Sequence, residues 1–89
     1  MQQDHRIVGI HLTDRLQRAV ELQAVLTEYG ACIRTRLGLH EVEHADSPNG
    51  VVLLETVGAP GRIDAMVAAL KDIDGLEVQE MRFAHETGQ

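Results

Sequence analysis

Residues that could bind an anion lie at a regular spacing in the middle of the chain. Arg34, Arg36, Gly38 and His40 are each separated by one residue. In an extended strand, residues two apart point to the same face, so these side chains would line one face of a strand. Two guanidinium groups suit the oxygens of a carboxylate or phosphate, and a glycine lets a ligand or a neighbouring backbone approach closely. The spacing predicts a site for a small anion between subunits, and an edge strand kept soluble by its charges is the alternative.

His40 and His44 have the character of metal ligands, because three carboxylates lie between and after them. Neutral imidazole and carboxylate ligands suit nickel or zinc. On a strand, however, ligands on the same face fall two residues apart, and Val42 occupies the position between the two histidines. We therefore interpret this segment as a polar loop near a turn and expect no bound metal or cofactor. A site that uses His40 and His44 is the alternative.

The sequence contains no pattern typical of catalysis. Its five histidines form no Ser-His-Asp or Cys-His arrangement that the order of elements would bring together, and no glycine-rich loop could cradle a phosphate. The segment 58–61 (GAPG) precedes a helix and is interpreted as a turn. Cys32 is the single cysteine, and we interpret it as a half-buried strand residue that cannot form an internal disulfide. We expect a protein without catalytic residues and without enzymatic activity.

Length and charge exclude several kinds of partner. The chain has 89 residues, with 8 Lys and Arg against 14 Asp and Glu, so the formal net charge is −6. This deficit of positive charge, together with the scarcity of aromatic residues, argues against direct binding of nucleic acid. The longest apolar run is Val51–Leu54, which is far too short to cross a membrane, and we expect no export signal. We therefore expect a cytoplasmic protein made of one domain.

Hydrophobic periodicity predicts four strands and two helices. The strands are expected at 6–12, 32–40, 51–57 and 76–83, and the helices at 14–29 and from position 60 to about 73. Gly30 follows the first helix, where we expect a residue in the left-handed conformation, and Gly75 lies just past the second helix. We also predict a bulge at Gln79–Glu80, where the alternation breaks, and frayed tails at 1–5 and 84–89.

The order β-α-β-β-α-β predicts an α+β architecture of the ferredoxin-like type. Right-handed crossovers place both helices on one face of a four-stranded antiparallel sheet, with the first and third strands in the middle. Along the second strand, the alternation predicts that the odd positions from Ile33 to Leu39 face the helices. Arg34, Arg36 and Gly38 would then face away from the helices.

The two central strands are apolar on both faces. Val51–Leu54 and Ile7–Val8 are uninterrupted apolar runs, whereas a sheet with one wet face alternates apolar and polar residues. A domain of this size also buries only about 60% of the surface that its unfolded chain exposes. We therefore predict that another copy of the chain covers the open face, with Leu53 and Leu54 pointing to opposite sides. The expected assembly is a homo-oligomer, a dimer or a tetramer, formed through the open sheet face or the strand edges.

Short motifs along residues 6–83 resemble those of a known family. They are Thr13-Asp14-Arg15, Ile33-Arg34-Thr35-Arg36-Leu37-Gly38-Leu39-His40, Asn49, Leu70 and Gly75-Leu76-Glu77-Val78. With these motifs and this order of elements, the chain resembles the small proteins proposed as regulators of the iron-only hydrogenase system. That family implies an ACT-like form of the ferredoxin fold and a stand-alone regulatory or ligand-sensing domain. It also implies an oligomer without enzymatic activity and without an established ligand.

Two other families of similar layout differ at their binding residues. ACT domains that bind amino acids carry a Pro-Gly pair between the first strand and the first helix, where this chain has Thr13-Asp14-Arg15-Leu16. The metal-binding domain of nickel-responsive repressors carries a His-x-His pair on its second strand and a cysteine that opens its third. His44 stands for one of those histidines, but Val42 and Gly50 occupy the other two positions. A square-planar nickel site would therefore lack two ligands.

These observations favour a transcriptional or maturation regulator of a redox enzyme that senses a small-molecule effector or another protein. Two rival hypotheses come from other classes of protein. One is a metal-binding module that uses His40 and His44. The other is a small dimeric enzyme of ferredoxin-like fold, which would work in a cleft between sheet and helices. His11, at the end of the first strand, would be the residue to examine there.

Overall fold

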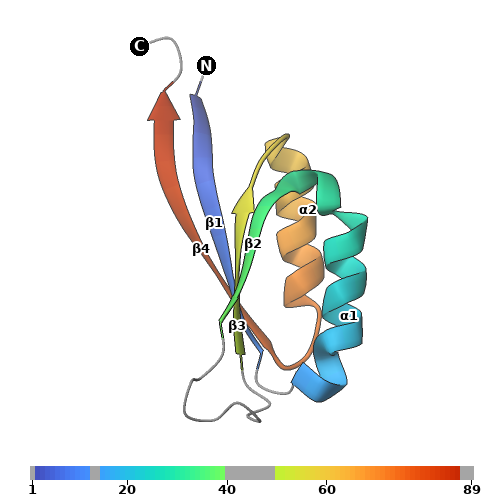
Figure 1. Cartoon of the computed structure of the whole chain (residues 1–89). Coiled ribbons are helices and arrows are strands. Elements are labelled where there is room, and N and C mark those ends of the chain that lie inside the picture. The colour runs from blue at the N-terminus through green and yellow to red at the C-terminus, as the bar shows by residue number, and fades with distance from the viewer. Residues whose placement is uncertain (1, 13–14, 40–49, 87–89) are drawn as a thin grey trace.

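The computed structural model describes residues 2–12, 15–39 and 50–86, and most of them belong to regular elements. These elements are β1 (Gln2–Leu12), α1 (Arg15–Glu28), the 3₁₀ turn η1 (Gly30–Cys32), β2 (Ile33–Leu39), β3 (Gly50–Thr56), α2 (Pro60–Lys71) and β4 (Leu76–Glu86) (Figure 1). The order of strands and helices is the one predicted.

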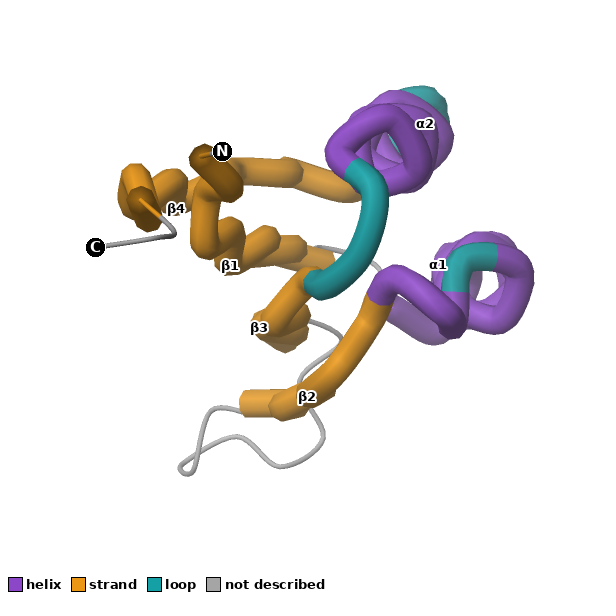
Figure 2. Tube along the Cα trace, turned by 90° about the horizontal axis from the view of Figure 1, so that it is seen from above, coloured by secondary structure: helices purple, strands orange, loops and turns teal. Residues whose placement is uncertain are grey.

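The four strands form one antiparallel sheet in the order β2-β3-β1-β4. Both helices lie on the same side of this sheet, as the view from above shows (Figure 2). The chain therefore has the ferredoxin-like α+β fold. The predicted placement of both helices, and of β1 and β3 in the middle of the sheet, is confirmed.

The start of α2 and the turns around it follow from a few residues. Pro60 occupies the start of the helix, where its fixed φ fits and its missing N–H would have no partner within the helix. Gly58 before the helix and Gly75 after it have φ values of +100° and +87°, which residues with a side chain rarely adopt. Gly30 has no positive φ and begins η1 instead. The prediction of a left-handed residue at Gly30 is therefore wrong.

The core lies between the sheet and the helices. Val8 on β1 and Leu54 on β3 are opposite each other in register, and both are fully buried. Ile10 follows on the same face, and Met66 and Leu70 of α2 are also fully buried. Further buried apolar side chains in the described chain are Leu12, Leu22, Leu26, Tyr29, Cys32, Ile63, Val67 and Ile73. The core is thus almost entirely aliphatic, as the composition requires.

The other side of the sheet, named here the open face, carries the residues that alternate with the core. Leu53 lies on this face between Leu37 on β2 and Gly9 on β1. Its large apolar side chains are those of Ile7, Leu37, Leu39, Val51, Leu53, Met81 and Phe83. No described helix or strand covers the open face (Figure 2). Leu53 and Leu54 point to opposite sides of the sheet, as predicted.

Strands β1 and β4 pair along their whole length without a shift in register. The predicted bulge at Gln79–Glu80 is therefore wrong, and Glu80 simply lies opposite Val8 on the helix side of the sheet. Frayed tails are also a wrong prediction for residues 2–5 and 84–86, because these residues belong to the two strands. Positions 1 and 87–89 lie outside the described residues.

Candidate functional site

The edge strand β2 holds the arginines predicted to bind an anion, and its register shifts where they begin. Ile33 is opposite Thr56 of β3, but Thr35 is already opposite Glu55. The strand therefore contains one residue more than its partner, and Arg34 is this extra residue. Such a bulge changes which side chains lie on each face of the strand.

The bulge reverses the faces that alternation alone predicts. Arg36 is opposite the buried Leu54 and so lies on the helix side of the sheet. Its Nη2 donates a hydrogen bond to Oε1 of Gln23 on α1 at 3.1 Å. Leu37 lies on the open face, where it is 50% exposed. The prediction that odd positions face the helices is therefore wrong beyond Ile33.

The charge of Arg34 acts on Glu55, a residue of the open face. Thr35 Oγ1 donates a hydrogen bond to Glu55 Oε1 at 2.7 Å, and Nε2 of His5 lies 3.2 Å from Oε2 of the same carboxylate. The bond from Thr35, then that from His5, and the nearby charge of Arg34 hold the pKa of Glu55 below its ordinary value of 4.5. Arg36 thus lies on the helix side of β2, whereas the charge of Arg34 acts on a carboxylate of the open face, so the two arginines do not act side by side as predicted.

Gly38 lies on the helix side of β2, opposite Val52. A Cβ atom at Gly38 would meet nothing within 4 Å, so there is open space beside it. His40 and His44 lie outside the described residues, and both the anion site and the alternative metal site that use them stay predictions. The described chain has no cluster of three His, Cys, Asp or Glu side chains suited to a metal ion, and no helix in it is long and apolar enough to span a membrane.

His11 lies on the open face, near the end of β1. It is opposite Val51 and Glu77 in register, and its Nδ1 is 3.5 Å from Oε1 of Glu77. The next residue, Leu12, is the one buried beneath the helices. His11 therefore points away from the space between sheet and helices, where the enzyme hypothesis needs it.

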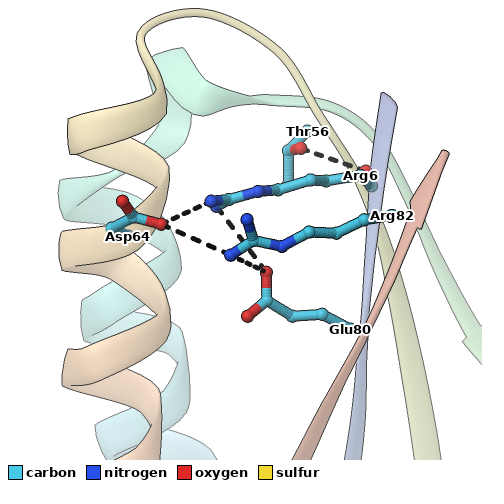
Figure 3. Close-up of polar contacts among 5 residues, drawn as sticks. All are labelled: Arg6, Thr56, Asp64, Glu80 and Arg82. Atoms are coloured by element: carbon cyan, nitrogen blue, oxygen red, sulfur yellow. Dashed lines mark hydrogen bonds and ion pairs between the residues drawn. The ribbon is translucent and has the colours of Figure 1, made fainter. Parts of the chain in front are cut away.

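A cluster of four charged residues lies between β1, β4 and α2 (Figure 3). Arg6, on the helix side of β1, donates a hydrogen bond from Nη2 to the carboxylate of Asp64 on α2. Its Nη1 lies 3.6 Å from Oε2 of Glu80 on β4. Nη2 of Arg82 lies 3.8 Å from Oδ1 of Asp64 and 3.6 Å from Oε2 of Glu80. Positive and negative groups therefore alternate around a closed circuit, named here the charge ring.

Burial explains why the charge ring exists. The side chain of Arg6 is only 5% exposed, and a buried guanidinium group without a partner is costly. Its hydrogen bond holds the pKa of Asp64 below the ordinary value of 3.8. Arg6 Nη1 and Glu80 Oε2 have no hydrogen-bond partner among the described residues, so they attract each other through charge alone. Thr56 joins the same region by donating a hydrogen bond to the carbonyl oxygen of Arg6 at 3.0 Å.

Sequence reasoning missed the charge ring, although part of its signal was present. Val78, Glu80 and Arg82 follow one another at every second position of β4 and so lie on the same face of the strand. Val78 packs against the core. A charged residue on the core side of a strand needs a buried partner. Nothing in the local pattern names Asp64 as that partner, because it comes from a distant helix.

Comparison with known proteins shows similarity in fold. No protein-family model and no curated protein sequence matches the chain. An uncharacterized protein from Thermotoga maritima has a TM-score of 0.77 at 19% identity, over 93% of this chain and 99% of that one. A protein from Thermus thermophilus, described as a PII-like signalling protein, has a TM-score of 0.59 at 10% identity, over 98% and 94%. A nitrogen regulatory PII-like protein from Thiomonas intermedia, bound to ADP, AMP and bicarbonate, has a TM-score of 0.52 at 8% identity, over 97% and 99%.

These likenesses extend over nearly the whole length of both chains in each pair. They show that the chain shares its ferredoxin-like architecture with proteins of the PII-like type. At such low identity a shared fold does not carry a shared ligand or target. The link to a hydrogenase therefore stays a prediction from the sequence motifs.

Proposed function

We propose that the chain is a non-enzymatic regulatory domain that binds a small anionic effector at the edge of β2 and acts as a homo-oligomer. The observation that carries the proposal is the bulge at Arg34 in an outer strand. Bulges redirect side chains and are frequent at sheet edges and beside binding sites. The charge of Arg34 acts on Glu55, a residue of the open face, and Arg36 lies on the helix side. An anion at this edge would meet one guanidinium group from each face of the sheet.

The rest of this edge also suits an anion. Within the described chain, Arg36 contacts the neutral amide of Gln23 and no carboxylate. On its outer side, the edge strand β2 has backbone N–H groups that do not bond to a neighbouring strand of the sheet. Gly38 leaves open space two residues beyond Arg36. A carboxylate or phosphate oxygen would accept hydrogen bonds from both kinds of donor, and those from the guanidinium would be the stronger.

Fold and motifs support a sensing role over a catalytic one. The PII-like protein from Thiomonas binds ADP, AMP and bicarbonate, which are anions, and we expect an effector of this chemical class. The resemblance to regulators of the iron-only hydrogenase system favours a redox enzyme as the target. Its expression or maturation would be controlled in the cytoplasm. Control of a gene would need a separate DNA-binding protein, because a net charge of −6 repels the long row of phosphates along a DNA duplex, whereas a small anion meets only the local charge of the arginines.

Thermal unfolding and titration calorimetry with ADP, AMP and bicarbonate test this proposal. A ligand that binds only the folded state raises the unfolding midpoint. We expect at least one of these anions to do so, and we expect Arg36→Met to weaken its binding about tenfold or more. Arg62→Met is the matched control, because Arg62 stacks on the ring of Tyr29, 4.5 Å from its centroid. The proposal fails if none of the three anions binds, or if both variants bind like the natural chain.

A further inference from the structure

Exposed apolar side chains are concentrated on the open face. Of the five large ones in the described chain, Leu37, Leu39, Met81 and Phe83 lie on this face and Val20 lies on α1. Each of the four is between 45% and 57% exposed. Single exposed apolar residues are ordinary, whereas a contiguous group of them marks an interaction surface. The partly exposed Ile7 and Leu53 join the four into one apolar band.

The apolar area of this band is comparable with the apolar part of a standard subunit contact. The four side chains together expose on the order of 400 Å², which is comparable with the largest apolar patch of an ordinary monomer. A specific interface buries about 800 Å² on each partner, and somewhat more than half of that area is apolar. The band therefore supplies about the apolar surface of one standard interface. A small ligand would cover only a fraction of it.

Gly9 lies in the middle of the open face, and no contact with the described residues requires a glycine there. It belongs to the central strand β1 and pairs with Leu53 on one side and Gln79 on the other. A Cβ atom would lie 3.6 Å from Leu53 Cδ2 and 3.8 Å from the carbonyl oxygen of Gln79, which are ordinary contacts. Its φ is not positive. Glycine weakens a strand interior and often marks close approach by another molecule, which makes Gly9 a candidate for such an approach.

We propose that a second copy of the chain packs its open face on this one, with a side chain of the partner seated over Gly9. The proposal rests on the proposed function, which requires an oligomer, and specifies how that oligomer forms. A two-fold axis lets the same patch serve on both sides of the contact. Because Gly9 has no side chain, a side chain of the partner can lie directly over its backbone, between Leu53 and Gln79.

The charges of the open face favour a second copy as the occupant. On the open face His5 pairs with Glu55 and His11 with Glu77, and the charge of Arg34 also acts on Glu55. Each pair holds one imidazole and one carboxylate, so two copies can place a histidine of one opposite a glutamate of the other. The whole chain carries a net charge of −6, and like-charged surfaces repel. The open face places an imidazole beside each of these two carboxylates and the charge of Arg34 close to Glu55, so it is the surface on which two copies repel each other least.

Sedimentation velocity at micromolar concentrations tests the proposed contact with a matched pair of variants. Leu37→Glu and Val20→Glu each place a carboxylate where an exposed apolar side chain stood, on the open face and on α1 respectively. We expect the natural chain and Val20→Glu to sediment as a dimer or a larger oligomer, and Leu37→Glu as a monomer. Circular dichroism shows whether each variant is folded.

Gly9→Val tests the seat over Gly9 itself. Within a protomer the added side chain begins at ordinary contact distances and raises strand propensity, so the variant should fold. We expect its dissociation constant to rise about tenfold or more, because the new side chain occupies the space over the strand where the proposal seats the partner.

Three outcomes would overturn the proposal. The natural chain could be monomeric, Val20→Glu could dissociate the oligomer while Leu37→Glu does not, or Gly9→Val could assemble like the natural chain. A monomeric natural chain would also contradict the homo-oligomer of the proposed function, but none of the three results decides whether ADP, AMP or bicarbonate binds, which is what tests the sensing role. Failure of the contact is therefore distinguishable from failure of the sensing role.

Discussion

The guanidinium group of Arg6 and the carboxylate of Asp64 meet at the boundary between the sheet and α2, the first buried and the second exposed (Figure 3). The side chain of Arg6 is 5% exposed and that of Asp64 is 61% exposed. Asp64 therefore keeps much of its hydration, whereas Arg6 depends on its acidic neighbours. If Asp64 is lost, Arg6 still faces Glu80; if Arg6 is lost, Glu80 loses its buried partner.

Replacement of Arg6 should therefore cost more stability than replacement of Asp64. Arg6→Met leaves the carboxylate of Glu80, which is 18% exposed, with the half-exposed Arg82 as its remaining cationic neighbour among the described residues. Removing one member of a buried ion pair costs about 3 kcal/mol or more. Asp64→Asn keeps an oxygen that can accept the hydrogen bond from Arg6, so we expect a smaller loss. Urea denaturation followed by circular dichroism measures both.

A double variant distinguishes the cost of leaving the Glu80 carboxylate without Arg6 from the cost of losing the packing of the Arg6 side chain. Replacing both members of a buried pair by apolar residues of similar size is often neutral or stabilising. We therefore expect Arg6→Met combined with Glu80→Met to be more stable than Arg6→Met alone. Equal instability of the single and double variants would mean that packing of the arginine stem, and not the charge ring, is what matters.

Acid should weaken the fold through Asp64 and Glu55. The hydrogen bond from Arg6 lowers the pKa of Asp64 below 3.8, and those from Thr35 and His5 lower the pKa of Glu55 below 4.5. A carboxyl group with a lower pKa in the folded state stabilises the fold fully above its unfolded pKa. That contribution is lost as the pH falls through the folded pKa. The free energy of unfolding should therefore fall as the pH drops below about 4.5.

The matched control for this pH dependence is Asp64→Asn. Asparagine does not titrate, so the variant lacks the part of the acid loss that comes from Asp64. Urea midpoints measured from neutral pH down to about pH 2 should fall less steeply for the variant than for the natural chain. Parallel curves would contradict the assignment of this acid sensitivity to the Arg6–Asp64 pair.

The fold could be predicted because its signals are local. Pro60 marks the start of α2, Gly75 follows its end, and apolar residues at two different periods separate strands from helices. Once the order of elements is known, handedness places both helices on one face of the sheet. The strand ends were less predictable, because residues 2–5 and 84–86 carry no apolar alternation and are held by pairing with each other.

The candidate site was harder to predict, because one extra residue decides it. The bulge at Arg34 turns Arg36 toward α1, and nothing in the alternation of β2 reveals such a shift. The prediction placed a bulge at Glu80, where the alternation visibly breaks. That break is explained by the charge partner of Glu80 on another strand, Arg6, and not by an irregular backbone. Pairing between segments distant in the sequence thus determines the face and the partner of these side chains, which the local pattern does not predict.

Two glycines near the start of α2 should respond in opposite ways to alanine. Gly58 has a φ of +100°, so Gly58→Ala should cost about 1 kcal/mol or more through backbone strain. Gly61 lies in α2, and a Cβ atom there would meet nothing within 4 Å. Gly61→Ala should therefore stabilise the protein by up to about 1 kcal/mol. Urea denaturation of both variants measures the difference, and a stabilising Gly58→Ala would show that the turn adopts another conformation.

Two adjacent leucines should differ strongly in their effect on stability. Leu54 is fully buried under the helices, whereas Leu53 lies on the open face. Truncating a buried leucine to alanine leaves a cavity and costs about 3 kcal/mol. Leu53→Ala leaves no enclosed cavity in a single protomer, so its cost there should stay below about 1 kcal/mol.

The comparison of the two leucines is sharpest in the Leu37→Glu background, which we expect to be monomeric. Subunit association then adds nothing to the measured free energy of unfolding. In the natural background, Leu53→Ala should also raise the dissociation constant of the oligomer, because it removes apolar surface from the proposed contact. Leu54→Ala should leave that constant nearly unchanged as long as the protein stays folded. If Leu53→Ala cost as much as Leu54→Ala in the monomer, both side chains would be core residues and the assignment of the open face would be wrong.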